Sequence, residues 1–371
     1  MPFADQLIDS GTADDLAAAV ALVSPPGAPA LAAAGARLAG LALRERADLL
    51  RDALLADVPG SYADLASVVR AARSATPTFR GWMIWPVTAA VASRGVADDS
   101  FDDALALLAE LTGLLTSEFA IRTLLRHDLD RALGTIATWT ASSDEHVRRL
   151  ASEGTRPYLP WSVRVPELTG RPGVTVPILD GLYRDESEYV RRSVANHLND
   201  LSRDVPELVT ATAVRWLADP DEHTARVVRH GLRTLVKRGD PGALALLGFA
   251  SAGDALEIDG PHLDRAVVAM GESVEFRAGL RNTGGDDLRL AVDYVVHHRK
   301  ANGGQTSKTF KLTTATVRPG ETLEVRRAHS FRAITTRRYY AGAHAIALQI
   351  NGVETERAVF ELVGSAIGPF L

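Results

Sequence analysis

Two different periods of apolar and polar residues divide the chain. From residue 1 to about 250, apolar side chains recur at spacings of three and four, as at Leu38, Leu41 and Ala42. Side chains at these spacings share one face of an α-helix. Proline and glycine interrupt the pattern at 25–27 and 59–60, where we expect helices to end. This part of the chain is therefore predicted to be a series of amphipathic helices.

Beyond residue 250 the period falls to two. Apolar and polar residues alternate over 274–278, 290–296, 323–326 and 345–350, a pattern typical of strands with one buried face. Turn signals rich in glycine and asparagine separate these stretches. About seven short strands in roughly 115 residues indicate an immunoglobulin-like β-sandwich. We therefore predict two domains, a helical one at 1–252 and a β domain at 253–371.

One helical motif nearly repeats within the first domain. A Val-Arg-Arg sequence at 147–149 returns at 190–192, after 43 residues, and a weaker third copy lies at 221–226. Helical repeats of this length are typical of stacked helix pairs of the HEAT or armadillo kind. The predicted fold class is thus mostly α, a HEAT-like α-α solenoid followed by a small immunoglobulin-like β-sandwich.

The two strong copies carry more polar chemistry than a solenoid core needs. Helical spacing places Val190 and Val194 on a buried stripe and leaves a polar face of Arg192, Asn196, Asn199 and Asp200. The 43-residue period aligns Glu153 with Asn196, and stacking would put both faces on one concave surface. An ordinary Arg149–Glu153 ion pair that stabilises the solenoid is the alternative. The loop at 153–161, rich in Gly, Pro, Tyr and Trp, favours a functional role.

Composition narrows the possible chemistry. The chain has no cysteine, which excludes disulfides, thiol nucleophiles and thiolate metal sites and fits the cytoplasm. No apolar run is long enough to span a membrane, and the first residues do not look like a signal peptide. His146, His197 and His223 recur at helix positions without metal-binding spacing, so no metal site is expected.

The net charge of −5 hides an uneven distribution. Residues 1–117 carry a net charge of −6, residues 118–240 are balanced, and residues 281–340 carry +7. A polyanionic partner must therefore be judged from local surfaces rather than from the total. The basic residues at 281–340 could be solvated strand edges that oppose aggregation. They could instead approach DNA, with 302–305 or 337–339 as a probing loop.

Several ordered segments resemble the AlkC-type DNA alkylation repair glycosylases of the AlkC/AlkD HEAT-like repeat superfamily. The matching segments are 116–122, 145–157, 159–161, 190–200, 232–237 and 246–249. The resemblance covers about residues 40–250, and the β domain looks like the immunoglobulin-like domain of some members. The chain departs from the family at 123–125, where a proline and an aromatic residue are more usual.

The resemblance implies a monofunctional enzyme that excises cationic methylated bases from duplex DNA without full base flipping. The substrate would be 3-methyladenine, and in some members 3-methylcytosine or 1-methyladenine. Glu118, Glu153 and Asp200 match the family's catalytic carboxylates, and we expect Asp200 and Glu153 to be the central pair. A methylated base is already a good leaving group, so no cofactor is required. Carboxylates can stabilise charge on the sugar and accept a proton from water.

Basic and amide side chains near the repeats are expected to hold the DNA. The residues predicted to bind DNA or shape the site are Arg148, Arg149, Arg156, Trp161, Arg191, Arg192, Asn196, Asn199 and Lys237. Arginines at such positions contact phosphates and make binding salt-dependent. The partner would be alkylated double-stranded DNA, with no membrane, bound by a monomer in a bacterial cytoplasm.

Two other functions remain open from the sequence. One is a HEAT-repeat protein that binds DNA without catalysis, and the other is a protein-interaction scaffold. Arginines and carboxylates on one concave face favour a DNA partner, whereas an apolar groove would favour a scaffold.

Overall fold

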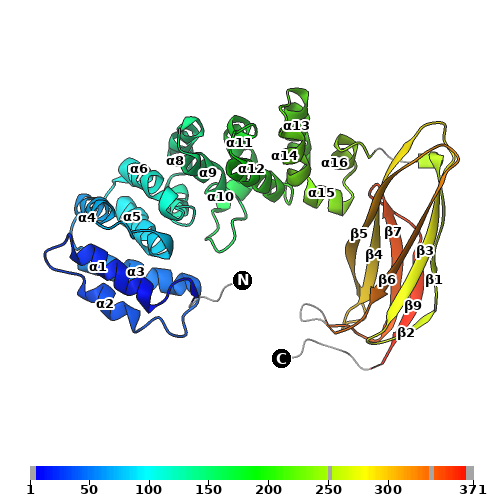
Figure 1. Cartoon of the computed structure of the whole chain (residues 1–371), viewed down its shortest axis with the longest axis horizontal. Coiled ribbons are helices and arrows are strands. Elements are labelled where there is room, and N and C mark those ends of the chain that lie inside the picture. Colours follow the sequence, from blue (N-terminus) through cyan, green and yellow to red (C-terminus); the bar gives the residue numbers. More distant parts are fainter. Residues whose placement is uncertain (1–5, 250–252, 334–337, 365–371) are drawn as a thin grey trace. The chain divides into compact units, whose positions relative to one another are not determined.

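A computed structural model of the chain describes residues 6–249, 253–333 and 338–364. It forms two compact units, residues 1–231 and 232–371, coloured along the chain in Figure 1. The first unit is helical, and the second contains two short helices and all the strands. The fold class predicted from the sequence, a HEAT-like solenoid followed by an immunoglobulin-like sandwich, is confirmed.

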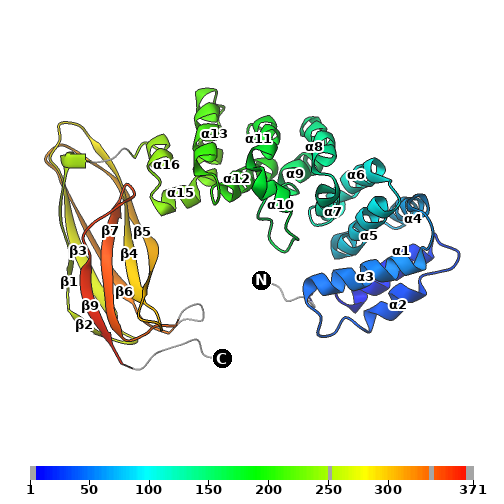
Figure 2. The ribbon, with the colours of Figure 1, turned by 180° about the vertical axis from the view of Figure 1, so that it is seen from behind.

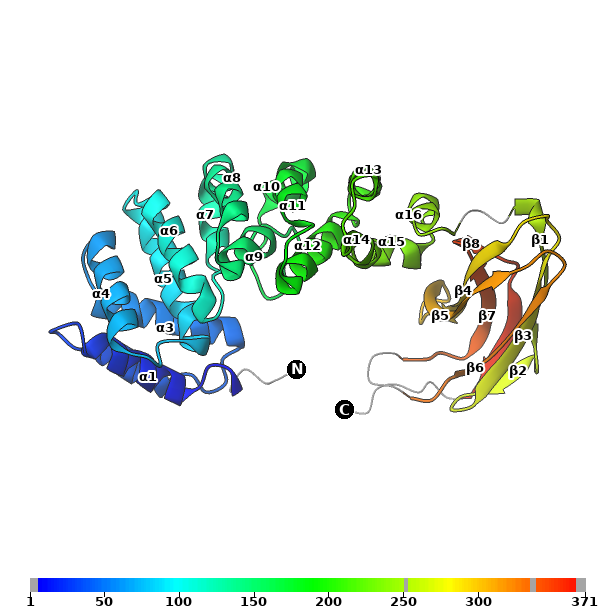
Figure 3. The same cartoon turned by 45° about the horizontal axis from the view of Figure 1, so that its top comes forward.

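The first unit is built from helices stacked in two rows. Its α-helices are α1 (Ser10–Ala21), α2 (Pro29–Gly35), α3 (Leu43–Asp57), α4 (Tyr62–Ala75), α5 (Ile84–Ala97), α6 (Phe101–Leu111), α7 (Ile121–His127), α8 (Leu129–Thr138), α9 (Glu145–Glu153), α10 (Pro166–Gly170), α11 (Val176–Leu182), α12 (Glu188–Leu201), α13 (Pro206–Ala218) and α14 (Thr224–Gly231). Figure 3 shows α6, α8, α11 and α13 along one side of a curved row. Helices α5, α9, α12 and α14 lie along its inner side.

The repeated Val-Arg-Arg motif has a structural explanation on α9 and α12. Arg148 Nη1 donates to the carbonyl of Ser142, six residues earlier, at 2.9 Å. Arg191 Nη1 donates to the carbonyl of Asp185, again six residues earlier, at 2.5 Å. Each arginine therefore ties the preceding turn to its own helix and satisfies carbonyl groups near the helix start. The first arginine of the motif repeats because the solenoid joint repeats.

The second unit begins with two short helices and continues as a β-sandwich. Its elements are α15 (Arg233–Arg238), α16 (Pro241–Leu246), β1 (Leu256–Leu263), β2 (Val267–Ala269), β3 (Ser273–Asn282), β4 (Leu288–Arg299), β5 (Gln305–Val317), β6 (Thr322–Ser330), β7 (Gly342–Ile350), β8 (Val353–Glu354) and β9 (Ala358–Val363). One sheet has the order β1-β3-β6 and the other β2-β9-β7-β4-β5, with β8 beside β7 (Figure 2). Neighbouring strands are antiparallel except β2 and β9.

The alternation of apolar and polar residues located those strands that bury one face in the core. The predicted stretches fall within β3, β4, β6 and β7, and Phe276, Val292 and Leu348 enter the shared core. Strand β5 was not predicted, because its Thr- and Lys-rich residues are mostly exposed and show no clear alternation. An edge position in the sheet explains this composition.

The helices α15 and α16 belong with the sandwich rather than with the solenoid. Arg289 of β4 donates from Nη1 to the carbonyl of Leu247 at 3.2 Å. Its guanidinium also lies 4.7 Å from the centre of the Phe249 ring. The boundary predicted after residue 252 therefore marks the change from helix to strand, and as a domain division it stays a prediction.

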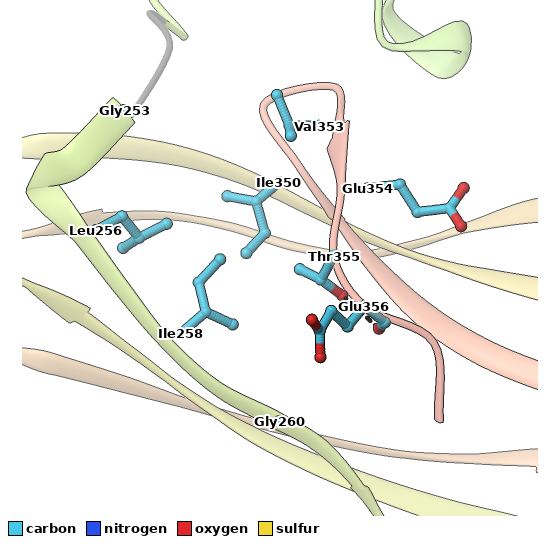
Figure 4. Close-up of a pocket in the computed structure, with 9 residues that line it drawn as sticks. All are labelled: Gly253, Leu256, Ile258, Gly260, Ile350, Val353, Glu354, Thr355 and Glu356. Atoms are coloured by element: carbon cyan, nitrogen blue, oxygen red, sulfur yellow. Dashed lines mark hydrogen bonds between the residues drawn. The ribbon is translucent and has the colours of Figure 1, made fainter. Parts of the chain in front are cut away.

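A pocket of about 380 Å³ opens at the side of the sandwich (Figure 4). Leu256, Ile258 and Ile350 form its apolar wall, and Glu354 and Glu356 lie on the other side. Two carboxylates disfavour a phosphate group there, so we place no nucleic-acid contact in this pocket.

The structure describes all of one candidate probing loop of the β domain and only part of the other. Residues 302–305 join β4 to β5 and are exposed. Arg337 lies outside the described residues, and Tyr339 is buried in the sandwich core. Tyr339 is thus a packing residue rather than a probing side chain. No helix in the described ranges is long and apolar enough to cross a membrane.

Candidate active site

The three predicted catalytic carboxylates come together in the helical unit. Glu118 lies in the segment before α7, Glu153 ends α9, and Asp200 lies near the end of α12. Helices α9 and α12 pack against each other through apolar stripes in which Leu150 and Val194 are fully buried. Polar side chains beside these stripes therefore meet, and all three carboxylates are buried.

Arg149 links the first two carboxylates. It forms an ion pair with Glu118, and its Nη2 lies 3.6 Å from Glu153 Oε1. The hydroxyl of Thr116 donates to Glu118 Oε2 at 2.9 Å. The guanidinium of Arg149 also lies 5.1 Å from the centre of the Tyr189 ring. The predicted Arg149–Glu153 pair is thus one part of a larger network.

Arg156 links the second and third carboxylates. Its Nη1 donates to Glu153 Oε1 at 2.6 Å, and its Nε donates to Asp200 Oδ2 at 2.9 Å. Ser193 of α12 donates to the other oxygen of Glu153 at 2.7 Å. Glu153 therefore lies at the centre of the network, held by two arginines and a hydroxyl group.

Burial affects the two glutamates differently. For Glu118, burial raises the pKa above its usual range, and Arg149 only partly offsets that effect. For Glu153, burial acts to raise the pKa, but Arg149, Arg156 and Ser193 outweigh it, so the pKa is lowered. Glu153 is thus held as a carboxylate, whereas Glu118 can exchange a proton closer to neutral pH. This separation is typical of acid–base sites.

A cavity of about 310 Å³ opens beside the network. Glu118, Glu153, Arg149 and Arg156 contribute its polar wall. Among the described residues, Asp200 does not line it; it contacts the site through Arg156. The structure thus brings Glu118 together with Glu153 at the cavity, whereas the sequence favoured Asp200 as the partner of Glu153.

Aromatic side chains form another large part of the cavity wall, beside Leu115, Leu159 and Pro160. Trp82, Phe119, Trp161 and Tyr189 line it, and Phe119 stacks on Trp85 at 4.2 Å between ring centres. Trp161 is 49% exposed and has a φ of 59°, in the left-handed region that non-glycine residues rarely adopt. An exposed aromatic residue in a strained conformation is a feature of functional sites.

The remaining predicted DNA-binding residues occupy three kinds of position. Arg148 and Arg191 are buried and bind backbone carbonyls, and Arg148 also pairs with buried Asp185 at 2.7 Å. Arg192 is exposed, and no ion pair to it is found in the described ranges. Lys237 is exposed on α15, in the other unit.

A second cavity, also about 310 Å³, lies between α12 and α14. Arg192, Arg226, His223 and His230 line it together with Glu188, which pairs with Arg226 at 2.8 Å. Asn196 lies on the same helix as Arg192 and is half-buried, whereas Asn199 is buried. The polar face predicted for α12 therefore divides into a basic cavity at its start and the carboxylate network at its end.

Several residues of the site were not predicted from the sequence. Thr116 and Ser193 bind the two glutamates, and Trp82 and Tyr189 complete the cavity wall. Arg122 is fully buried beneath the loop that follows α9. Arg122 had a detectable signal, a charged residue three positions before Leu125 and therefore on the same helical face. In the part of the chain that the structure describes, no group of three His, Asp or Glu residues could hold a metal ion.

Comparison with known proteins places this geometry in a family. Residues 257–364 match the family described as "Uncharacterised protein YhaZ, C-terminal Ig-like domain". Uncharacterized protein YhaZ of Bacillus subtilis (strain 168) is 34% identical over 322 residues, which cover 87% of this chain and 88% of that protein.

A solved structure resembles almost the whole chain. It is Pseudomonas fluorescens alkylpurine DNA glycosylase AlkC bound to DNA containing an abasic site analog. It is 35% identical to this chain, with a TM-score of 0.84, and the match covers 98% of this chain and 100% of that one. The chain therefore belongs to the AlkC family of HEAT-like repeat proteins with a C-terminal immunoglobulin-like domain.

Proposed function

We propose that this protein is a monofunctional DNA glycosylase that removes cationic methylated bases from duplex DNA. The observation that carries the proposal is the wall shared by Glu118 and Glu153, two carboxylates with oppositely shifted pKa values beside an aromatic cavity. The 35% identity to an alkylpurine DNA glycosylase over nearly the full length supports the same activity.

The proposed reaction is hydrolysis of the bond between C1′ of the deoxyribose and the base nitrogen. The base leaves with the bonding electron pair, which neutralises its positive charge, so no acid has to protonate it. Positive charge then develops on the sugar, and the ionised Glu153 stabilises it. Glu118 accepts a proton from the water whose oxygen bonds to C1′. Asp200 holds Arg156 in place at 2.9 Å and acts through it.

The aromatic wall favours a cationic substrate. Trp82, Trp161 and Tyr189 present ring faces or edges to the same cavity as the two carboxylates. Aromatic rings and carboxylates both attract cations. We propose 3-methyladenine as the main substrate, with 3-methylcytosine or 1-methyladenine as further candidates. Because Trp161 is exposed at the cavity, we propose contact with a nucleotide that has not been fully flipped out.

The basic cavity between α12 and α14 is proposed to bind a phosphate of the same DNA. Arg192 and Arg226 lie one and two repeats beyond Arg149, so the repeat itself generates a row of cationic groups. Arg149 is neutralised by Glu118 and Glu153, whereas Arg192 is not paired with a carboxylate in the described ranges. Phosphate contacts of this kind would set the register of the DNA and make binding salt-dependent.

The test is release of free 3-methyladenine from methylated duplex DNA. We expect release by the wild type, and a large reduction of release in Glu153→Gln and Glu118→Gln. The matched control is Glu207→Gln, which removes an exposed carboxylate on α13 away from the network and should leave the rate unchanged. The proposal is wrong if the wild type releases no base.

The non-catalytic alternative gives a different outcome in the same assay. Binding of methylated duplex DNA without base release would identify a DNA-binding protein that lacks catalysis. No salt-dependent binding at all would favour a protein-interaction scaffold. Parallel substrates carrying 3-methylcytosine or 1-methyladenine would define the range of bases.

A further inference from the structure

We propose that Arg122 is a positioning residue, which holds the loop between α9 and α10 so that Arg156 and Trp161 face the two glutamates. The activity part of this proposal rests on the proposed glycosylase function. Arg122 itself lies outside the cavity wall, on α7, and its side chain is fully buried. It contacts neither carboxylate in the described structure, so any effect on catalysis must pass through the loop.

Three hydrogen bonds connect Arg122 to the loop. Its Nε donates to the carbonyl of Val163 at 2.5 Å. Its Nη1 donates to the carbonyls of Gly154 at 3.2 Å and Arg156 at 2.8 Å. These carbonyls lie at the beginning and at the end of the loop. One rigid guanidinium therefore fixes both ends, which a flexible ammonium group could not do in the same way.

Two further arginines hold the same loop. Arg44 of α3 donates to the carbonyl of Trp161, and Arg164 Nη1 donates to the carbonyl of Pro157 at 3.0 Å. Backbone carbonyls in a loop have no helix or strand partners, and here arginine side chains satisfy them. The left-handed backbone of Trp161 is unfavourable for a non-glycine residue and persists only where its surroundings enforce it. Arg122 is the buried member of this set.

The charge of Arg122 lies in an unfavourable environment. Burial, together with repulsion from Arg164 and Arg156, lowers the pKa of Arg122 to about 10. Its Nη2 is buried and has no hydrogen-bond partner in the described ranges, and such a group is unfavourable. Because the side chain remains charged at neutral pH, its three hydrogen bonds to carbonyl groups offset the cost of burying that charge. These hydrogen bonds hold the residues of the loop in place.

The loop carries residues that shape the site directly. Arg156 bonds to both Glu153 and Asp200, and its own carbonyl is one of the groups held by Arg122. Trp161 forms the exposed part of the aromatic wall. A shift of the loop would therefore move one partner of Glu153 and one wall of the cavity together. Displacements of about 1 Å at a catalytic site can cost on the order of 100-fold in rate.

The experiment compares Arg122→Met and Arg122→Lys with a matched control, Arg46→Met. Arg46 is also buried and donates to two backbone carbonyls, those of Ile8 and Leu41, but does not contact the loop. Each variant is made in the full chain, and thermal unfolding is measured alongside steady-state base release. We expect Arg122→Met to lower kcat by about 10- to 100-fold with little change in KM. Arg122→Lys should recover part of that loss. Arg46→Met should lower the thermal stability but leave kcat unchanged.

A second measurement does not depend on catalysis. Quenching of tryptophan fluorescence by acrylamide is compared between each protein and its Trp161→Phe derivative, so that the difference reports on Trp161 among the five tryptophans. We expect Arg122→Met and Arg122→Lys to change the quenching of Trp161, and Arg46→Met to leave it unchanged. If the wild type releases no base, this measurement still tests the position of the loop.

The proposal would be overturned by either of two results. One is wild-type kcat in a folded Arg122→Met or Arg122→Lys protein. The other is unchanged quenching of Trp161 in those proteins. If Arg122→Met does not fold, Arg122→Lys decides the question by both measurements.

Discussion

At the scale of single residues, charged partners separate the roles of two buried glutamates that lie close together in space. Glu118 has one arginine partner and a hydroxyl group, and its pKa is raised by burial. Glu153 has two arginine partners and a hydroxyl group, and its pKa is lowered. Both are buried to a similar extent. The number of charged partners, rather than burial, therefore decides which carboxylate stays ionised.

This difference predicts opposite effects on stability. A raised folded-state pKa means that the charge on Glu118 opposes folding at neutral pH, so Glu118→Gln should leave the free energy of unfolding unchanged or increase it. The depressed pKa of Glu153 means that its charge contributes stability above its unfolded pKa, a contribution lost as the pH falls. Glu153→Gln should therefore cost about 3 kcal/mol. Urea unfolding at pH 7 measures both, and a larger loss in Glu118→Gln would contradict the assignment.

The pH dependence of base release tests the role of Glu118. If Glu118 must be ionised to accept a proton, kcat/KM should fall as the pH drops through its raised pKa. The acid limb should then lie above the ordinary glutamate value of about 4.3. Residual activity in Glu118→Gln should lack this limb. An unchanged limb in that variant would assign it to another group.

At the scale of secondary-structure elements, adjacent arginines have separate roles. Neighbouring residues on a helix point about 100° apart. Arg148 therefore faces the joint between repeats and pairs with Asp185, whereas Arg149 faces the carboxylates. On α12, Arg191 faces the equivalent joint and Arg192 is exposed beside the basic cavity. The first arginine of each motif serves the fold, and the second serves the proposed site.

Substitution of one arginine of each kind tests this division. Arg148→Ala leaves the buried carboxylate of Asp185 without its main partner and should cost about 3 kcal/mol of stability. Its effect on the salt dependence of DNA binding should be small. Arg192→Ala should leave stability nearly unchanged but reduce the slope of log affinity against log salt by about one. Chemical unfolding and a salt titration of duplex binding measure both effects; reversed results would reverse the roles.

At the scale of the whole molecule, the position of the boundary between the two units depends on where helices α15 and α16 pack. Their buried Leu235 and Leu244 belong to the second unit, and Arg289 of β4 contacts residues just beyond α16. The sequence places the change of pattern near 252, about twenty residues later than the compact boundary at 231. A division at 252 would therefore separate these helices from the strands they accompany.

Truncation compares the two boundaries. A fragment of residues 232–371 should unfold cooperatively at a higher temperature than a fragment of residues 253–371, by roughly 5–10 °C if the lost contacts contribute 1–2 kcal/mol. The helical fragment 1–231 should melt like 1–252, since α15 and α16 lie in the other unit. Thermal unfolding by circular dichroism measures all four fragments. Equal stability of the two β fragments would support the boundary at 252.

The sequence by itself determined the two architectures, and its resemblance to a known family pointed to the three carboxylates. Apolar residues that recur every three to four positions mark a helix, and those that recur every two mark a strand. Both patterns are local, because they depend only on the spacing of neighbouring residues. Four alternating stretches therefore located β3, β4, β6 and β7. The motifs that resemble the family, rather than local periodicity, pointed to Glu118, Glu153 and Asp200, which the structure brings into one network.

Only the tertiary structure decided which partner each charged group takes. Arg148 and Arg149 are equivalent in charge and adjacent in sequence, yet their partners lie on different segments. Arg122 acts on a loop more than thirty residues away, which no local pattern can reveal. Glu118 rather than Asp200 faces the cavity because Arg156 lies between Asp200 and that space. Long-range pairing depends on how helices pack, whereas spacing along the chain records only which face is buried.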